Sequence, residues 1–199
     1  MPAAPASVED LAAAATTCQA CELFRDATQT VFGEGPDHSR VVLVGEQPGD
    51  EEDRIGQPFV GPAGRILDEA LEAAGIDRHD TYVTNAVKHF RWEARGKRRL
   101  HKKPGIEHIR ACAPWLEAEL ATVDPEVVVC LGATAAQALL GRDFRVTQHR
   151  QEFFEADGGH LVTATVHPSS ILRAPDADAR QAGMQAFVDD LGAVAARLS

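Results

Sequence analysis

Short apolar runs and longer amphipathic segments alternate along this chain. Three runs rich in β-branched residues predict buried parallel strands, at residues 40–45, 81–87 and 126–131. Four segments are predicted as helices, at residues 62–75, 106–123, 133–140 and about 179–198. Residues 151–155 and 161–166 flank the turn sequence Asp157-Gly158-Gly159, which is typical of a hairpin. The pattern therefore predicts strands interleaved with helices.

This alternation favours the α/β class, as a three-layer α/β/α sandwich with a central, largely parallel sheet. Ligands bind such sheets beyond the carboxyl ends of the strands. Gly45, Asn85, Gly132 and His167 each close or follow a predicted strand, so we expect them to converge on one rim. Neither a repeat nor a linker divides the sequence, and residues 1–199 are predicted to form a single domain.

Charge is distributed unevenly along the chain. The net charge of −10 argues against a protein that coats nucleic acid non-specifically. Eight of the 20 Lys and Arg residues nevertheless lie between residues 88 and 103, where only Glu93 opposes them: Lys88, Arg91, Arg95, Lys97, Arg98, Arg99, Lys102 and Lys103. Residues 89–104 also lack apolar periodicity, which predicts a long basic loop. Local contact with a polyanion and a solvated surface explain such a charge run equally well.

A membrane partner is not expected. Residues 11–15 are apolar but far too short to span a bilayer, and no basic segment typical of secretion signals precedes them. The composition, 44% hydrophobic and 25% charged, is that of a globular domain. We therefore expect a soluble cytoplasmic protein. We also expect a monomer, because no surplus amphipathic surface calls for a partner.

Four cysteines suggest a metal centre: Cys18, Cys21, Cys112 and Cys130. The first two form a CxxC pair, whereas 17 residues separate the last two. Disulfides are unfavourable inside cells, and four thiolates suit either zinc or a [4Fe–4S] cluster. Zinc sites more often combine two close-spaced pairs, and the presence of only one favours iron–sulfur. The alternative is an incidental CxxC pair and a Cys130 that packs as a small apolar side chain.

Several short loops carry polar or aromatic groups next to predicted strands. Residues 45–50 (GEQPGD, here called the motif loop) contain two glycines that allow a ligand close to the backbone. The Gly-Lys-Ser/Thr ending of a Walker loop is missing from them. Residues 58–62 (PFVGP) place Phe59 on a turn before a helix, and residues 167–170 (HPSS) end the last strand. Taken singly, each of these segments also suits an ordinary turn or core position.

Together these elements resemble the uracil-DNA glycosylase superfamily, in particular its iron–sulfur family 4 and the related UdgX proteins. The resemblance runs from Cys18 to Arg173. It rests on GE-x-PG at residues 45–49, GxPFVGPAG at 56–64, TNAVK at 84–88, the cysteine spacing and HPS at 167–169. One departure is Gln151, which stands where related sequences lead us to expect glycine.

The resemblance implies a uracil-DNA glycosylase-like fold that acts on uracil-containing DNA, single- or double-stranded. It implies a structural [4Fe–4S] cluster on the four cysteines that pins the N-terminal segment 8–30 to the domain. Phe59 is expected to stack on a flipped-out uracil and Asn85 to read its polar edge. His167 is expected to donate to the uracil oxygen where negative charge grows as the glycosidic bond breaks.

The resemblance assigns the remaining roles to the motif loop and to basic residues. Glu46, Gln47 and Asp50 are the other catalytic residues, and Gln47 also contacts uracil. Contacts to DNA are assigned to Lys97, Arg98, Arg99, Lys102, Ser169 and Arg173.

Two details favour covalent capture of DNA, as in UdgX proteins, over repeated hydrolysis. Gln47 occupies the position of the obvious base, and an amide has no useful proton affinity. Residues 95–101 (RGKRRLH) resemble the basic loop whose histidine attacks C1′ of the deoxyribose in UdgX proteins. We therefore expect His101 to trap the abasic sugar, with the surrounding lysines and arginines keeping it neutral. Glu46 is expected to stabilise the sugar cation.

Other functions stay open at this point. The chain could be a conventional family 4-type hydrolase that turns over, with His101 as an ordinary phosphate contact. It could be a non-catalytic iron–sulfur module that binds uracil-DNA. A redox protein that transfers electrons through the cluster is a further alternative, but it leaves Glu46, Phe59, Asn85 and His167 without a role.

Overall fold

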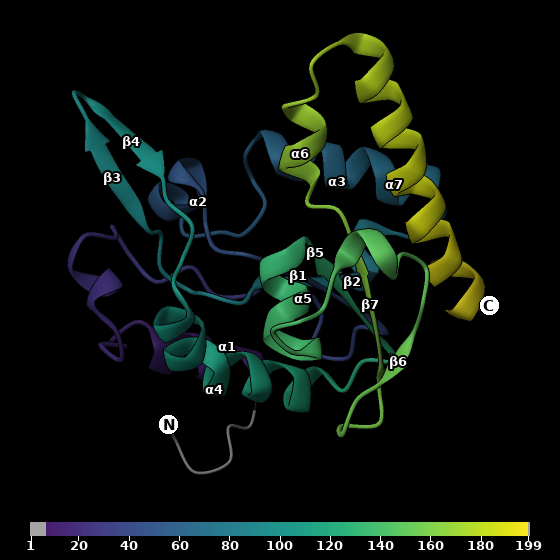
Figure 1. Cartoon of the computed structure of the whole chain (residues 1–199). Helices are drawn as coiled ribbons and strands as arrows, with labels where there is room; N and C mark the ends of the chain where they lie inside the picture. Colours follow the sequence, from purple (N-terminus) through teal and green to yellow (C-terminus); the bar gives the residue numbers. More distant parts are fainter. Residues whose placement is uncertain (1–6, 199) are drawn as a thin grey trace.

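The computed structural model describes residues 7–198 and contains a five-stranded sheet in the order β2-β1-β5-β7-β6 (Figure 1). Its strands are β1 (Val41–Gly45), β2 (Thr81–Asn85), β5 (Val127–Leu131), β6 (Phe154–Glu155) and β7 (Leu161–Thr165). All neighbours pair in parallel except β6, which forms the predicted antiparallel hairpin with β7 at one edge. The predicted α/β sandwich is confirmed. The predicted single domain also included residues 1–6 and 199, which lie outside the described part.

Helices cover both faces of this sheet (Figure 1). One face packs against α1 (Val8–Ala15), α4 (Ile106–Val123) and α5 (Ala133–Leu140), and the other against α3 (Pro62–Ala73), α6 (Pro168–Leu172) and α7 (Ala177–Leu198). Successive strand residues point to opposite faces, so Val42 and Val44 enter the first core whereas Val41 and Leu43 enter the second. None of the helices within residues 7–198 is long and apolar enough to cross a bilayer.

Several short elements complete the chain. These are α2 (Asp50–Ile55) and the 3-10 turns η1 (Glu22–Arg25), η2 (Arg78–Asp80) and η3 (Val146–Gln148). The sequence pattern did not predict α1, whose apolar residues are mostly alanines, or α2, whose single apolar residue is Ile55, because neither segment shows a recognisable apolar period.

The prediction of a long loop at residues 89–104 is wrong, because these residues contain a second, two-stranded sheet. Strands β3 (Trp92–Arg95) and β4 (Arg98–His101) pair antiparallel around a turn at Gly96, whose φ is +61°. This hairpin projects away from the main sheet beside α2 (Figure 1). Its central residues are mostly exposed on both faces, so no apolar alternation marks the strands in the sequence. The register places His101 opposite Trp92, at the base of the hairpin.

Lys88 does not belong to the basic surface that the sequence predicted. Its side chain is 1% exposed and forms an ion pair with Glu119 of α4, which is 0% exposed. Glu119 also accepts hydrogen bonds from the hydroxyls of Tyr82 and Thr84, each at 2.8 Å, and Lys88 Nζ donates to the backbone oxygen of Asn85 at 2.8 Å. Because both charged groups are paired and hydrogen-bonded, this buried network holds the end of β2 in place against α4.

The departure at Gln151 has a structural explanation. Its φ of +63° lies in the left-handed region, where glycine is the default residue. The side chain compensates in part by donating to Asp190 of α7 at 3.1 Å, next to the ion pair between Arg150 and Asp190. A glycine would relax the backbone at this position and would lose that hydrogen bond.

Candidate active site

The four strand-end positions converge as predicted. Gly45 and Asn85 are register partners on β1 and β2, and Asn85 and His167 line the same narrow cavity of about 30 Å³. A wider cleft of about 590 Å³ adjoins this cavity and includes Gly132. Gln47, Ala63 and His167 line both spaces. The carboxyl rim of the sheet is therefore a pocket with an open approach.

Phe59 and Asn85 form a wall suited to a planar polar ring. The Oδ1 atom of Asn85 is buried and has no hydrogen-bond partner among residues 7–198. Phe59 lies beside it with a strained φ of +57°. A Cβ atom on Gly45 would stand 2.3 Å from Asn85 Oδ1 and 2.7 Å from Phe59 Cζ, so only glycine permits this approach. A buried acceptor without a donor is costly unless a ligand supplies one.

His167 presents a neutral donor to the same cavity. It caps α6, and its Nδ1 atom accepts from the backbone N–H of Ser169 at 3.1 Å. Burial lowers the pKa of His167 to about 4, with smaller contributions from the charges of Arg173 and His101. Near pH 7 the ring is therefore neutral, and because Nδ1 accepts, its proton resides on Nε2.

The base of the hairpin brings His101 to the motif loop. Gln47 Nε2 lies 2.9 Å from His101 Nε2, and Glu46 Oε1 lies 3.5 Å from the same atom. Gln47 is oriented by the backbone N–H of Arg91, which donates to its Oε1 at 3.1 Å. Because the amide Nε2 can only donate, His101 Nε2 must accept, and the lone pair of His101 therefore lies on Nε2.

The pKa of His101 is lowered, as expected, but the expected cause, the neighbouring lysines and arginines of the hairpin, is wrong. Partial burial is the main factor that lowers the pKa of His101, and the charge of Arg173 adds to it. Glu46 and Glu52 oppose the shift. Lysines and arginines of the hairpin are not among the causes. The net result is a ring that is more readily neutral than a free histidine.

The motif loop has two supporting side chains that the sequence patterns did not single out. The hydroxyl of Thr134, at the start of α5, donates to Glu46 Oε2. The carboxylate of Glu52 accepts from the backbone N–H groups of Gly49 at 3.1 Å and Gly61 at 3.0 Å, which ties the motif loop to the loop of Phe59. Glu52 lies in an acidic run with no recognisable spacing, so only the fold reveals its position.

These elements agree with a comparison against protein families, in which residues 32–192 match the model described as the uracil DNA glycosylase superfamily. The chain belongs to this superfamily. It is 40% identical over 157 residues to the type-4 uracil-DNA glycosylase of Thermotoga maritima, which covers 78% of each chain. It is 33% identical over 176 residues to the type-4 enzyme of Archaeoglobus fulgidus, covering 85% of each. A type-5 uracil-DNA glycosylase of Thermus thermophilus is 32% identical over 159 residues.

In this superfamily member Arg99 and Asp50 form an ion pair with each other. The guanidinium of Arg99 forms ion pairs with Asp50 and with the fully buried Asp53 of α2. Asp53 also accepts from the backbone N–H of Thr28 at 3.0 Å. Arg99 therefore anchors the hairpin to α2 and to the N-terminal segment. Neither Arg99 nor Asp50 lines the cavity or the cleft.

The other residues assigned to DNA binding lie on the surface or in the cleft. Lys97 and Arg98 are exposed at the tip of the hairpin. Lys102 is exposed and pairs with Glu93 at 3.1 Å. Ser169 and Arg173 line the cleft beside His101. Only Ser169 and Arg173 of these five residues line the cleft, and a role in DNA binding stays a prediction for all five.

The four cysteines are gathered where α4, β5 and the N-terminal segment meet. Cys18 packs against the core that contains Cys130, and Cys21 against a smaller cluster that contains Cys112. All four are free thiols. Trp115 Nε1 points to Cys18 Sγ at 3.2 Å, and the backbone N–H of Lys88 points to Cys112 Sγ at 3.5 Å. Two N–H groups directed at sulfur are suited to thiolate ligands.

The spacing of the sulfurs bears on which group would fit. Within residues 7–198, no three of them lie within 4.8 Å of one another. Thiolates around one zinc ion at about 2.3 Å would lie about 3.8 Å apart. As placed, the sulfurs are therefore spaced more widely than the ligands of a single zinc ion. Burial raises the pKa of Cys112 to about 11 and that of Cys130 to about 12, so both must lose a proton to become ligands.

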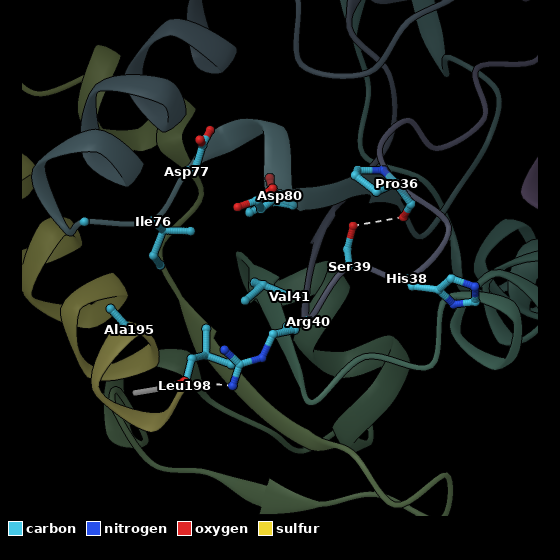
Figure 2. Close-up of a pocket in the computed structure, with 12 residues that line it drawn as sticks. Pro36, His38, Ser39, Arg40, Val41, Ile76, Asp77, Asp80, Ala195 and Leu198 are labelled. Atoms are coloured by element: carbon cyan, nitrogen blue, oxygen red, sulfur yellow. Dashed lines mark hydrogen bonds between the residues drawn. The ribbon is translucent and has the colours of Figure 1, made fainter.

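A separate cavity of about 440 Å³ lies at the opposite rim of the sheet (Figure 2). It adjoins Val41 and Thr81, the first residues of β1 and β2, and the end of α7. Arg40 closes one side by donating to the backbone oxygen of Leu198 at 2.7 Å. None of the candidate residues lines this cavity, which is consistent with a ligand site at the carboxyl ends of the strands.

Proposed function

We propose that this protein excises uracil from DNA and then retains the abasic sugar covalently through His101. The superfamily match and the type-4 relatives support uracil excision. The observation that carries covalent capture is the position of His101 Nε2, 2.9 Å from Gln47 Nε2 and 3.5 Å from Glu46 Oε1. A nucleophilic nitrogen thus lies in the cleft that opens beside the base pocket.

Uracil would be held by the wall of Phe59 and Asn85. A flipped-out base needs an aromatic face to replace its stacking partners and polar groups to identify its edge. The unpartnered Oδ1 of Asn85 is suited to accept from N3–H of uracil, and the amide NH₂ is suited to donate to the neighbouring O4. Cytosine lacks both of these groups in the required order, so the same amide discriminates against it.

His167 would assist departure of the base. When the bond between C1′ and N1 breaks, its electron pair moves onto uracil and charge develops on O2. The neutral Nε2–H of His167 can donate to that oxygen without competing for a proton, because the pKa of this histidine is about 4. A preorganised donor of this kind lowers the barrier by up to about 4 kcal/mol. The released uracil anion then takes a proton from water.

His101 would complete the reaction. Its Nε2 lone pair forms a bond to C1′ of the electron-deficient sugar, and the imidazolium that results loses its Nδ1 proton to solvent. Glu46, fixed by the hydroxyl of Thr134, lies close enough to stabilise positive charge on both the sugar and the ring. Fixed orientation gives a bound nucleophile an advantage over water.

Hydrolysis is the second candidate because Glu46 is 20% exposed in a cleft with room for water. In that case Glu46 would orient a water molecule toward C1′, and the protein would turn over. His101 decides between capture and hydrolysis, because its ring occupies the space beside Glu46 that the attacking water would need.

The four cysteines would hold a [4Fe–4S] cluster: Cys18, Cys21, Cys112 and Cys130. When bound, such a cluster supplies a cross-link between the N-terminal segment, α4 and β5. The gathered free thiols and the two N–H groups directed at sulfur support this proposal. None of the steps above passes through the cluster.

Denaturing electrophoresis after mixing with a uracil-containing single strand tests this proposal. Wild-type protein should give a heat-stable shifted band, and an otherwise identical strand with thymine should give none. His101→Ser should still release uracil but leave free abasic DNA, whereas the control His79→Ser, exposed on the turn η2 before β2, should retain the band. A wild-type protein that releases uracil without any shifted band would overturn capture. The absence of uracil release would overturn both steps.

A further inference from the structure

A second groove lies beside the catalytic cleft. It has a volume of about 420 Å³ and runs between the amino-terminal half of α4 and the helix α5. Lys103 lines both the groove and the cleft, so the two spaces are neighbours on the surface. A DNA strand whose uracil occupies the pocket can therefore extend into the groove without leaving the surface.

The groove is positively charged although the protein carries a net charge of −10. Lys103, Arg110 and Arg142 line it, and no carboxylate does. Within residues 7–198, none of these three cationic groups has an ion-pair or hydrogen-bond partner, in contrast to Lys88, Arg99 and Lys102, which are paired. Three unpaired cations around one hollow provide a local attraction for phosphates on a molecule whose net charge is negative.

The floor of the groove is apolar. Ile106 is 46% exposed and is one of two large exposed hydrophobic residues in the described part of the chain. Ile109, half-buried, lies one turn away in the same groove. Phosphate alone needs no such surface, whereas the sugar and base faces of single-stranded DNA do. In a duplex the base faces are stacked on one another and are not available to such a surface.

We infer that this groove binds the single-stranded DNA that flanks the uracil on one side. Phosphates lie on Lys103, Arg110 and Arg142, and a base or sugar covers Ile106. This inference rests on the proposed function, because it extends the path of the strand from the uracil pocket. It assigns a binding role to α4 and α5, for which the sequence motifs provide no indication.

Salt dependence of binding tests the inference, with the double variant Arg110→Gln/Arg142→Gln. Arg180→Gln/Arg197→Gln is the matched control, because it removes the same charge from α7 on the other face of the sheet. The probe is a fluorescent single strand with a central 2′-fluoro-arabino-uracil, whose glycosidic bond resists cleavage. Loss of two phosphate contacts should reduce the slope of log K against log salt by about 1.4 and weaken binding roughly 25-fold at 0.1 M salt. The control should match wild type.

Truncated and duplex probes make the test specific. A strand cut back to one nucleotide beyond uracil on the groove side should bind wild type and the groove variant equally, whereas truncation on the other side should preserve the difference. An unchanged salt slope on the long strand would overturn the inference, as would an equal loss of affinity for single-stranded and duplex probes. Uracil release by wild type is measured in parallel. If wild type released no uracil, the proposed function would be wrong, and the binding data would still show whether the groove binds single-stranded DNA.

Discussion

The chemistry of the site depends on which groups contact the oxygen and the nitrogen of the Gln47 side-chain amide. Gln47 accepts from a backbone N–H through Oε1, so its NH₂ group faces His101 Nε2 and the backbone oxygens of Arg91 and Lys102. A carboxylate at this position would instead attract a proton onto His101 Nε2 and remove its lone pair. Gln47 therefore selects the tautomer as well as the position of His101, and it cannot compete as a base.

The pH dependence of capture follows from the lowered pKa of His101. The ring must be neutral to attack, so capture should fall on acidification only below the ordinary histidine value of 6.5. Arg173 contributes to the lowering, so Arg173→Gln should raise the pKa of His101 and move the acid limb to higher pH. The measurement is the second-order rate of adduct formation at low DNA concentration, which reports the free protein.

The comparison variant for this profile is Arg180→Gln, on an exposed part of α7. It should leave the midpoint where wild type has it. A wild-type midpoint above 6.5, or an Arg173→Gln profile shifted to lower pH, would contradict the assigned role of burial and of Arg173.

At the scale of elements, the hairpin β3–β4 carries His101 but has little core of its own. Two-stranded ribbons are marginal in water, so the position of this one depends on its attachments. Arg99 provides an attachment through Asp50 and Asp53, and the indole N–H of Trp92 donates to the backbone oxygen of Asp26 at 3.0 Å. The position of His101, the proposed nucleophile, is thus set by Arg99 and Trp92, which do not line the cleft.

Arg99→Ala should separate excision from capture. The hairpin would lose its contact to α2, and Asp53 would be left buried with less compensation, so unfolding should become easier by a few kcal/mol. Uracil release should persist because Phe59, Asn85 and His167 are held elsewhere, while the adduct yield falls at least about ten-fold. Adduct and free abasic product are quantified on one gel, and thermal unfolding is recorded in parallel. Arg98→Ala, exposed on the same strand, is the control.

Much of this architecture could be predicted from the sequence, and the exceptions have physical causes. Strands β1, β2 and β5 of the main sheet are buried on both faces, so each appears in the sequence as a run rich in apolar residues that can be recognised. The hairpin is exposed on both faces and leaves none. Convergence of Asn85 and His167 follows from parallel topology, whereas the side chain partners of Lys88 and Arg99 depend on tertiary contacts. Charge alone could not distinguish a buried lysine from a DNA-binding one.

At the scale of the whole molecule, the cysteines and the proposed uracil pocket are connected through Lys88. The backbone N–H of Lys88 points to Cys112, while its side chain binds Asn85 O and Glu119. The same residue therefore links α4, the end of β2 and the proposed cluster ligand. Changes at this ion pair should affect stability first and base recognition second.

Glu119→Gln should show the cost of leaving Lys88 charged and poorly compensated in the interior. We expect a loss of about 3–5 kcal/mol in the free energy of unfolding. The double variant Lys88→Met/Glu119→Leu removes both charges and should recover a large part of that loss. Urea unfolding provides the measurement, and Glu117→Gln, exposed on the same helix, should be neutral within about 0.5 kcal/mol. A double variant less stable than the single would contradict the account.

Peptide mapping of the protein–DNA adduct tests the central claim most directly. Wild-type protein is incubated with a short uracil-containing strand, digested with protease and nuclease, and analysed by tandem mass spectrometry. The expected product is an abasic deoxyribose attached to the imidazole of His101 and to no other residue. An adduct on a different side chain, or complete uracil release with an unmodified His101 peptide, would contradict it.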